Sequence, residues 1–447
     1  MTIRLSDHFT FPRLFRFTFP SVVMMLFTSI YGVVDGFFVS NYVGKTPFAA
    51  VNMVWPFLMI CGAFGFMLGT GGSALVAKTF GEGKDKEARE LFSLLVYVSV
   101  GIGAVIVTLG LIFLRPIMAF LGAEGELLDY CVIYGRILLL SLIPYLLQNE
   151  FQSFLVTAEK PGLGLAVTVA AGVTNMALDF LLVGVFDFGL VGAAAATAVS
   201  QSVGGLFPLI YFFCRNKSRL RLGRTKWRGM ALLRACANGS SEFVVNISLS
   251  VIGMLYNVRL LDLAGEDGVA AYGVVMYVSF IFIAVFLGYT IGVSPLVSYH
   301  FGADNTEELQ NLFRKSILIV GSLSVVLTVI GEFCASLFAG LFVGYEEGLL
   351  DMTIRAFVVY SFSYLFVGFN IFGSSFFTAL NDGFVSASIS FLRTLVFQVI
   401  CVLLLPALLP PAYRLDGIWA ANPAAEAISI IVSITFFAAK RKKYHYA

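Results

Sequence analysis

The stretch that decides the fold occurs twice in the chain. Residues 71–92 read GGSALVAKTFGEGKDKEARELF, and residues 292–313 read GVSPLVSYHFGADNTEELQNLF. At this offset of 221 residues, nine of the 22 aligned positions are identical. The same offset places a second segment on identical residues at Asn149, Phe151, Ser153, Thr157 and Ala158. Two distant segments that agree at one offset indicate an internal repeat, with halves at residues 1–220 and 225–447.

Both halves are dominated by apolar residues. The 447-residue chain is 59% apolar and 13% charged, and its mean hydropathy is +0.90. A soluble domain has about 45–50% apolar and about 25% charged residues. The composition therefore excludes a soluble enzyme, a nucleic-acid-binding protein, a disordered chain and a secreted disulfide scaffold. The six cysteines are scattered through apolar runs without a Cys/His cluster, so we expect no metal centre and no disulfide.

The apolar runs are long enough to cross a bilayer as helices. A spanning helix needs about 20 mostly apolar residues, and the runs lack the alternation of a membrane β-barrel. Short turns rich in Gly, Pro, Asn and Asp separate the runs. Twelve spans are predicted, near residues 14–38, 48–77, 91–114, 127–157, 163–187, 189–214, 231–261, 269–299, 315–341, 349–379, 384–408 and 416–439.

The basic residues predict the orientation of these spans. With both termini in the cytoplasm, 22 of the 29 Lys and Arg residues fall on the cytoplasmic side and three fall outside. Positive residues favour the cytoplasmic side of a membrane protein. The sequence therefore predicts a multi-pass protein of the plasma (inner) membrane with both termini in the cytoplasm.

An even number of spans in each half gives both halves the same orientation. We therefore expect an all-α integral membrane protein of two six-helix lobes, related by a pseudo-twofold axis along the membrane normal. The predicted units are an N-terminal lobe at 1–214, a basic cytoplasmic linker at 215–230 and a C-terminal lobe at 231–447. Parallel repeats around a central cleft are typical of transporters that expose their substrate alternately on each side.

Several polar residues are predicted to converge in the outer half of the first lobe. Asp35 and Asp179 lie at similar depths in their spans, Asn175 is one turn from Asp179, and Thr197 is level with Asp179 across a hairpin. Oxygen ligands of this kind suit Na⁺, and two close carboxylates also suit a proton carrier. A packing cluster of hydrogen bonds is the alternative interpretation. The predicted coupling-ion site is therefore Asp35, Asn175, Asp179 and Thr197, with H⁺ or Na⁺ as the ion.

Other charges also lie at membrane depth. Glu150, with Gln148 and Asn149, forms a cluster too polar to face lipid, and we expect it to line the substrate cleft. A packing hydrogen bond is the alternative for Glu150. For Arg393 and Glu426, an ion pair that fixes helix packing is as good an interpretation as a functional role.

Four motifs resemble one known family. They are Gly69–Gly83 (GTGGSALVAKTFGEG), Val34–Ser40 (VDGFFVS), Asn175–Asp179 (NMALD) and Gly417–Glu426 (GIWAANPAAE). Together they resemble the multidrug and toxic compound extrusion (MATE) transporters, in particular the branch of the DNA-damage-inducible F type. The resemblance covers nearly the whole chain. It implies a twelve-helix, two-lobed antiporter that exports drugs in exchange for H⁺ or Na⁺, with the coupling ion at Asp35, Asn175, Asp179 and Thr197.

The resemblance adds one residue to the predicted substrate cleft, and the sequence differs from the family pattern at one place. The family's glutamate on the seventh helix matches Glu242, which the resemblance implies is in the substrate cleft. Family members with a cation site in the second lobe carry an acid on the tenth helix, whereas residues 366–370 (FVGFN) have none. The first lobe is therefore favoured as the site of coupling.

The sequence thus predicts a cation-coupled exporter of cationic or amphipathic small molecules that works by alternating access as a monomer. It needs no cofactor and no nucleic acid and is not an enzyme. The alternative is a flippase for a lipid-linked or amphipathic substrate, but the acidic residues of the cleft favour cationic cargo. An embedded enzyme would need a nucleophile and base at membrane depth, and a channel would not need the two-lobed repeat.

The linker itself carries seven basic residues and no acid between residues 215 and 228. Like charges repel one another, and the anionic inner leaflet attracts them. We therefore expect this segment to resist compact folding and to lie along the membrane surface.

Overall fold

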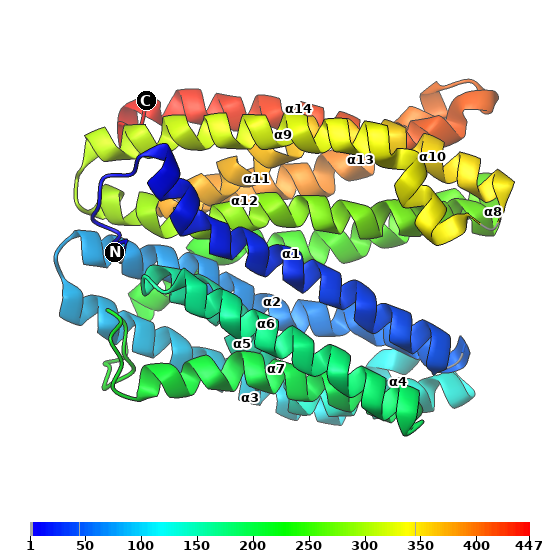
Figure 1. Ribbon diagram of the computed structural model, residues 1–447, viewed down its shortest axis with the longest axis horizontal. Coiled ribbons are helices and arrows are strands. Elements are labelled where there is room, and N and C mark those ends of the chain that lie inside the picture. Colours follow the sequence, from blue (N-terminus) through cyan, green and yellow to red (C-terminus); the bar gives the residue numbers. More distant parts are fainter. Residues whose placement is uncertain (1–2, 44, 345) are drawn as a thin grey trace.

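The computed structural model describes residues 3–43, 45–344 and 346–447, and these residues form helices and connecting loops without strands (Figure 1). The first half contains α1 (Phe11–Tyr42), α2 (Lys45–Gly81), α3 (Asp85–Phe120), α4 (Gly125–Leu140), α5 (Leu142–Thr157), α6 (Pro161–Leu178), the π-helix η1 (Asp179–Val185) and α7 (Gly189–Phe213). The second half contains α8 (Gly229–Gly302), α9 (Thr306–Val343), α10 (Glu347–Ser361), α11 (Tyr364–Ala379), α12 (Gly383–Phe391), the π-helix η2 (Leu392–Val396), α13 (Phe397–Leu408), the 3₁₀-helix η3 (Pro411–Tyr413) and α14 (Arg414–Tyr444).

These helices make twelve membrane spans. Within the described residues, nine helical stretches are long and apolar enough to cross a bilayer. Two further spans are bent helix pairs, α4 with α5 at 55° and α10 with α11 at 48°. The 74-residue α8 supplies the twelfth, because its rings of Tyr256 and Tyr272 stack 4.7 Å apart. Sixteen residues of straight helix would cover about 24 Å, so the chain reverses between them, at Gly265, whose φ is 65°.

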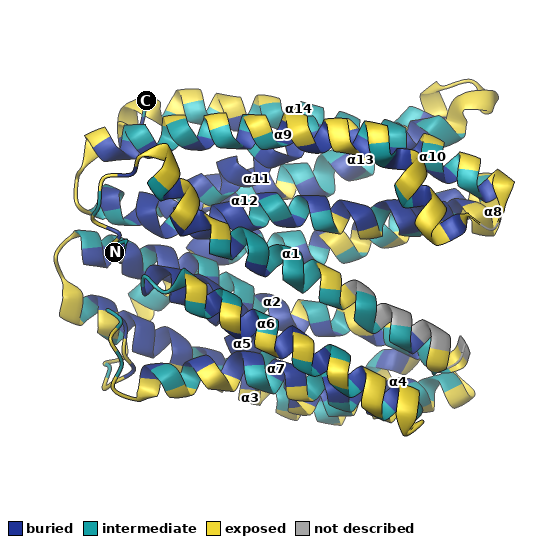
Figure 2. Cartoon of the chain, viewed as in Figure 1, coloured by how far each residue is buried: buried dark blue, intermediate teal, exposed yellow. Residues whose placement is uncertain are grey.

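The outer surface of the bundle is apolar. Figure 2 shows exposed residues along the outward faces of α3, α9 and α14. Large apolar side chains lie there, including Phe113 at 51%, Phe333 at 83% and Ile431 at 62% exposure. A soluble monomer rarely exposes so large a contiguous apolar surface, whereas lipid tails cover it without penalty. The all-α membrane fold that the composition predicts is therefore confirmed.

The two lobes are related by the 221-residue offset, because contacts between them repeat at this offset. On α2, the Cα of Gly71 lies so close to α8 that an added Cβ would be 2.3 Å from the nitrogen of Gly239. At the equivalent positions, a Cβ on Gly292 of α8 would be 2.9 Å from the Cα of Thr18 on α1. The repeat-related Gly81 and Gly302 pack against each other, on the axis itself. At least one residue in each contact must lack a side chain to permit this approach of helix backbones.

These glycine contacts lie toward the end of the bundle that carries both termini and residues 214–228, which we call the linker side (Figure 1). The contact between Gly81 and Gly302 joins the last turn of α2 to the last turn of α8. The lobes are therefore sealed against each other on the linker side.

The segment leading into each lobe is held by the other lobe. Before α1, the side chain of Glu308 in the first turn of α9 accepts hydrogen bonds from the backbone nitrogen of Phe9 at 2.9 Å and pairs with the ring of His8 at 2.5 Å. Before α8, Arg228 forms an ion pair with Glu87 in the first turn of α3. Glu87 and Glu308 are themselves related by the repeat offset. We call these two contacts the clasps.

The linker is bound to the first lobe along α3, which corrects the expectation of a loose segment. Leu220 and Leu222 are buried, Arg219 pairs with Asp85 at 2.9 Å, and the hydroxyl of Thr225 donates to the backbone oxygen of Glu90 at 2.7 Å. The expectation counted only the repulsion among the linker's own charges. The acidic start of α3 supplies the opposite charges, so the segment packs instead of spreading.

Candidate functional site

The four residues predicted to form the coupling-ion site lie together in the first lobe. Asp35 is on α1, Asn175 is on α6, Asp179 begins η1, and Thr197 is on α7. The hydroxyl of Thr197 donates to Oδ1 of Asp35 at 3.4 Å. The carboxyl of Asp35 also interacts with the side chains of Asp179 and Asn175. Three spans that are separate in sequence therefore bring their oxygen atoms to one place.

This oxygen cluster has unused binding capacity. Asp179 is completely buried, and Asn175 is 2% exposed. Neither carboxylate oxygen of Asp179 nor Oδ1 of Asn175 has a hydrogen-bond partner among the described residues. Buried polar oxygens without partners are strongly disfavoured unless a proton or a cation satisfies them. The donor set of two carboxylates, an amide oxygen and a hydroxyl suits either H⁺ or Na⁺.

A change of helix type positions Asp179. At this residue α6 widens into the π-helix η1, which continues to Val185. A π-helical turn adds a residue to the turn and is frequent at functional sites. The sequence pattern predicted a helix across this stretch, but periodicity alone gave no signal for the π-helix.

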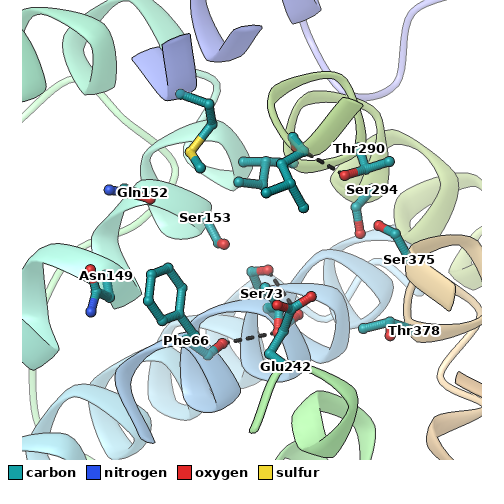
Figure 3. Close-up of a pocket in the computed structure, with 14 residues that line it drawn as sticks. Phe66, Ser73, Asn149, Gln152, Ser153, Glu242, Thr290, Ser294, Ser375 and Thr378 are labelled. Carbon is teal, nitrogen blue, oxygen red and sulfur yellow. Dashed lines mark hydrogen bonds between the residues drawn. The ribbon is translucent and has the colours of Figure 1, made fainter. Parts of the chain in front are cut away.

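A second feature is a small central cavity between the lobes, with a volume of about 60 Å³. Figure 3 shows Asn149, Gln152 and Ser153 on one wall, and Ser294, Ser375 and Thr378 on the opposite wall. The lining residues come from α1, α2, α5, α8 and α11: Met25, Phe66, Thr70, Ser73, Asn149, Gln152, Ser153, Glu242, Leu287, Thr290, Ile291, Ser294, Ser375 and Thr378.

The cavity lies on the pseudo-twofold axis. Three pairs of its lining residues are related by the 221-residue offset, namely Phe66 with Leu287, Thr70 with Ile291, and Ser73 with Ser294. A site built by both lobes changes shape when the lobes move relative to each other. Ser73 and Ser294 are identical at the repeat offset, and this identity is the sequence signal by which the cavity could have been predicted.

The structure separates the four residues expected in the substrate cleft. Asn149 and Glu242 line the cavity, whereas Gln148 and Glu150 do not. Because successive residues of a helix are about 100° apart, Asn149 shares its face with Gln152 and Ser153, and its two neighbours point elsewhere.

The expectation for Gln148 and Glu150 is therefore corrected to positions inside the first lobe. Gln148 packs against Gly204 of α7. Glu150 is completely buried, and its side chain interacts with that of Ser99 on α3. The polar cluster of α5 was recognised correctly, but composition alone did not assign its residues to faces.

The second lobe contains a buried ion pair. Nε of Arg393 on η2 lies 3.5 Å from Oε1 of Glu426 on α14. The amide of Asn370 on α11 donates to Oε2 of Glu426 at 2.7 Å. This pairing is the packing interpretation that the sequence left open.

Comparison with known proteins identifies the architecture. The family profile described as MatE matches twice, at residues 20–181 and 243–404, once in each lobe. The chain belongs to the MatE family. The multidrug export protein MepA of Staphylococcus saprophyticus is 24% identical over 365 residues, covering 80% of each chain.

Solved MATE structures share this fold. One is the outward-facing conformation of a multidrug resistance MATE family transporter of the MOP superfamily, with a TM-score of 0.90, 22% identity, and coverage of 97% of this chain and 96% of that chain. Another is a MATE protein in complex with MaL6, with a TM-score of 0.90, 22% identity and 97% coverage of both chains. At this identity the likeness establishes the fold, which is the twelve-helix, two-lobed arrangement predicted from the repeat.

Proposed function

We propose that this MatE-family protein is a cation-coupled exporter of cationic or amphipathic small molecules in the plasma membrane, working by alternating access. Family membership makes the chain a transporter and not an enzyme. The observation that carries the proposal is that the structure has two separate polar sites, the oxygen cluster of the first lobe and the cavity between the lobes. The oxygen cluster of the first lobe has unsatisfied carboxylate oxygens, whereas the cavity on the axis is lined by polar residues of both lobes and contains one carboxylate, Glu242.

The coupling step follows from the charges of the cluster. Two carboxylates at one buried site cannot both remain ionised cheaply unless a proton or a cation joins them. We infer that H⁺ or Na⁺ binds Asp35, Asn175, Asp179 and Thr197. α1 contributes Asp35 to this cluster and Met25 to the cavity. Ion binding at the first site is thereby transmitted to the second by movement of one helix.

The alternation follows from the packing of the lobes. We propose that lobes 1–214 and 231–447 move as units joined by the linker at 215–230, in a monomer. The Lys and Arg distribution places the linker side, and with it both termini, in the cytoplasm. The glycine contacts then close the cavity toward the cytoplasm, which is the state that releases cargo outside.

A flippase for lipid-linked substrates is the alternative function. A diphosphate headgroup would need basic residues in the cleft. The residues that line the cavity in the described chain include Glu242 but neither Lys nor Arg. The charge of the cavity therefore supports cationic cargo.

Transport by the purified chain in proteoliposomes tests this function. Ethidium efflux should be driven by an imposed pH gradient or by an imposed Na⁺ gradient, and the more effective gradient identifies the coupling ion. Asp35→Asn and Asp179→Asn should each abolish driven efflux, while equilibrium ethidium binding remains. Driven efflux at the parent rate in either variant would remove that aspartate from coupling, and flipping of a fluorescent lipid without ethidium efflux would favour the alternative.

A further inference from the structure

The second lobe does not repeat the oxygen cluster of the first lobe. At the 221-residue offset, Asp35, Asn175, Asp179 and Thr197 correspond to Tyr256, Val396, Ile400 and Ile418. The second lobe therefore has neither carboxylate at the equivalent positions. Charged residues of this lobe lie elsewhere, namely Glu242 on α8, Arg393 on η2 and Glu426 on α14.

These charges are organised around Glu426. Its side chain is 5% exposed, and the amide of Asn370 donates both to Oε2 at 2.7 Å and to its backbone oxygen at 3.0 Å. Asn370 is held in turn by the hydroxyl of Ser433, which donates to its Oδ1 at 2.8 Å. Glu426 is thus fixed by neutral donors, which leave its negative charge to be balanced by a cation.

Arg393 supplies that cation. Its side chain is 12% exposed, and its Nε lies 3.5 Å from Glu426 without a hydrogen bond to any described partner. The contact is therefore mainly one of charge. Arg393 lies in the π-helix η2, which packs against α8. From there it also interacts electrostatically with Glu242, the carboxylate of the central cavity.

We propose that Arg393 is a resident cation of the second lobe, which takes the place of a bound coupling ion and leaves ion binding to the first lobe. This inference rests on the proposed transport function and deepens it. A guanidinium is always protonated and cannot dissociate from the chain. Glu426 is accordingly neutralised throughout the transport cycle, and each cycle exchanges ions only at the first-lobe cluster.

Removing Arg393 should expose a new requirement for a cation. A buried carboxylate that loses its partner becomes an uncompensated charge, which a bound Na⁺ or a proton can neutralise. A ligand that binds only the folded state raises the unfolding temperature. Arg393→Gln should therefore make thermal stability depend on Na⁺ or on pH, and Glu426→Gln added to it should remove this dependence.

The measurement uses the full-length chain in detergent with Asp35→Asn and Asp179→Asn, so that the first-lobe oxygen cluster does not respond. Unfolding temperature is recorded in NaCl against choline chloride at equal ionic strength, and across a pH series. We expect Arg393→Gln to gain on the order of 3 °C more than the parent from Na⁺ or from acidification. Arg355→Gln is the matched control, because Arg355 pairs with Asp416 at an exposed position.

Each outcome decides the proposal. Equal responses of Arg393→Gln and the parent to both ions would overturn it. If Arg393→Gln does not fold, the double variant Arg393→Gln/Glu426→Gln distinguishes charge from packing. If the double variant folds, the result supports a resident cation. If the double variant does not fold, the arginine is needed for packing and the proposal is overturned. The measurement needs no transport, so its result and that of the efflux assay are independent.

Discussion

The seal between the lobes predicts the effect of a single methyl group. An added Cβ at Gly239 would lie 1.9 Å from the backbone oxygen of Met67, and ordinary van der Waals contact begins at 3.4 Å. Because the obstacle is backbone, α2 and α8 must separate by about 1.5 Å. Overpacking of this kind costs about 1–3 kcal/mol. Gly239→Ala should therefore shift the equilibrium away from the sealed state by roughly 5- to 150-fold.

Cys236 provides a reporter for this shift. It lies one turn before Gly239 and is half-buried, whereas the exposed Cys214 has to be replaced by serine. Alkylation of Cys236 by a membrane-impermeant maleimide should accelerate at least 5-fold in Gly239→Ala. Gly253→Ala is the matched control on the same helix, because its added Cβ meets nothing within 4 Å. Equal labelling rates in the two variants would refute the argument that this contact holds the seal.

Three further changes test other parts of the structure. Glu242→Gln should weaken binding of tetraphenylphosphonium about tenfold or more, while the buried Glu150→Gln leaves it within twofold; equal losses, measured by equilibrium binding, would place Glu150 back in the cleft. Glu308→Gln removes the charge that holds the backbone of Phe9 and the ring of His8, so limited trypsinolysis of the N-terminal segment should become several-fold faster, and an unchanged rate would mean that the clasp is held by packing. Burial alone would raise the pKa of Asp382, but the hydrogen bond from the Tyr444 hydroxyl and the charge of Lys440 hold that pKa below its usual value. A depressed folded-state pKa contributes stability that is fully present above the unfolded value of about 3.9 and is lost as the pH falls through the folded-state pKa. Tyr444→Phe should flatten this acid dependence of the unfolding temperature, and an unaltered profile would contradict the assignment.

The repeat is the part of the fold that the sequence predicts best. Identical residues at one offset fix the number of lobes, their common orientation and the axis between them, because these depend on topology alone. The oxygen cluster follows for a similar reason. Asp35, Asp179 and Thr197 could be placed by depth, since rise per residue in a helix is constant.

The predictions that the structure corrects concern the direction in which a helical side chain points and the distant partners of charged residues. The depth of a residue in the membrane does not determine which way its side chain points. The sequence therefore predicts Glu150 in the cavity, although the side chain faces the interior of the lobe. Reading the face shared by Asn149, Gln152 and Ser153 against the identical repeat pair Ser73 and Ser294 would have located the cavity. The linker failed for another reason, because its counter-charges are more than 100 residues away, on the acidic start of α3 around Asp85.

The clasps have a consequence for how the two halves of the chain face each other. Arg228 contacts Glu87, and His8 contacts Glu308, which is related to Glu87 by the repeat offset. Each half thus contacts the other half through the same region of its surface. This reciprocity is the mark of an isologous interface, in which two identical subunits face each other across a twofold axis. The two halves of this one chain therefore contact each other in the pattern that two identical subunits would use. The two halves nevertheless differ inside the bundle, because the first half holds Asp35 and Asp179 where the second half has Tyr256 and Ile400.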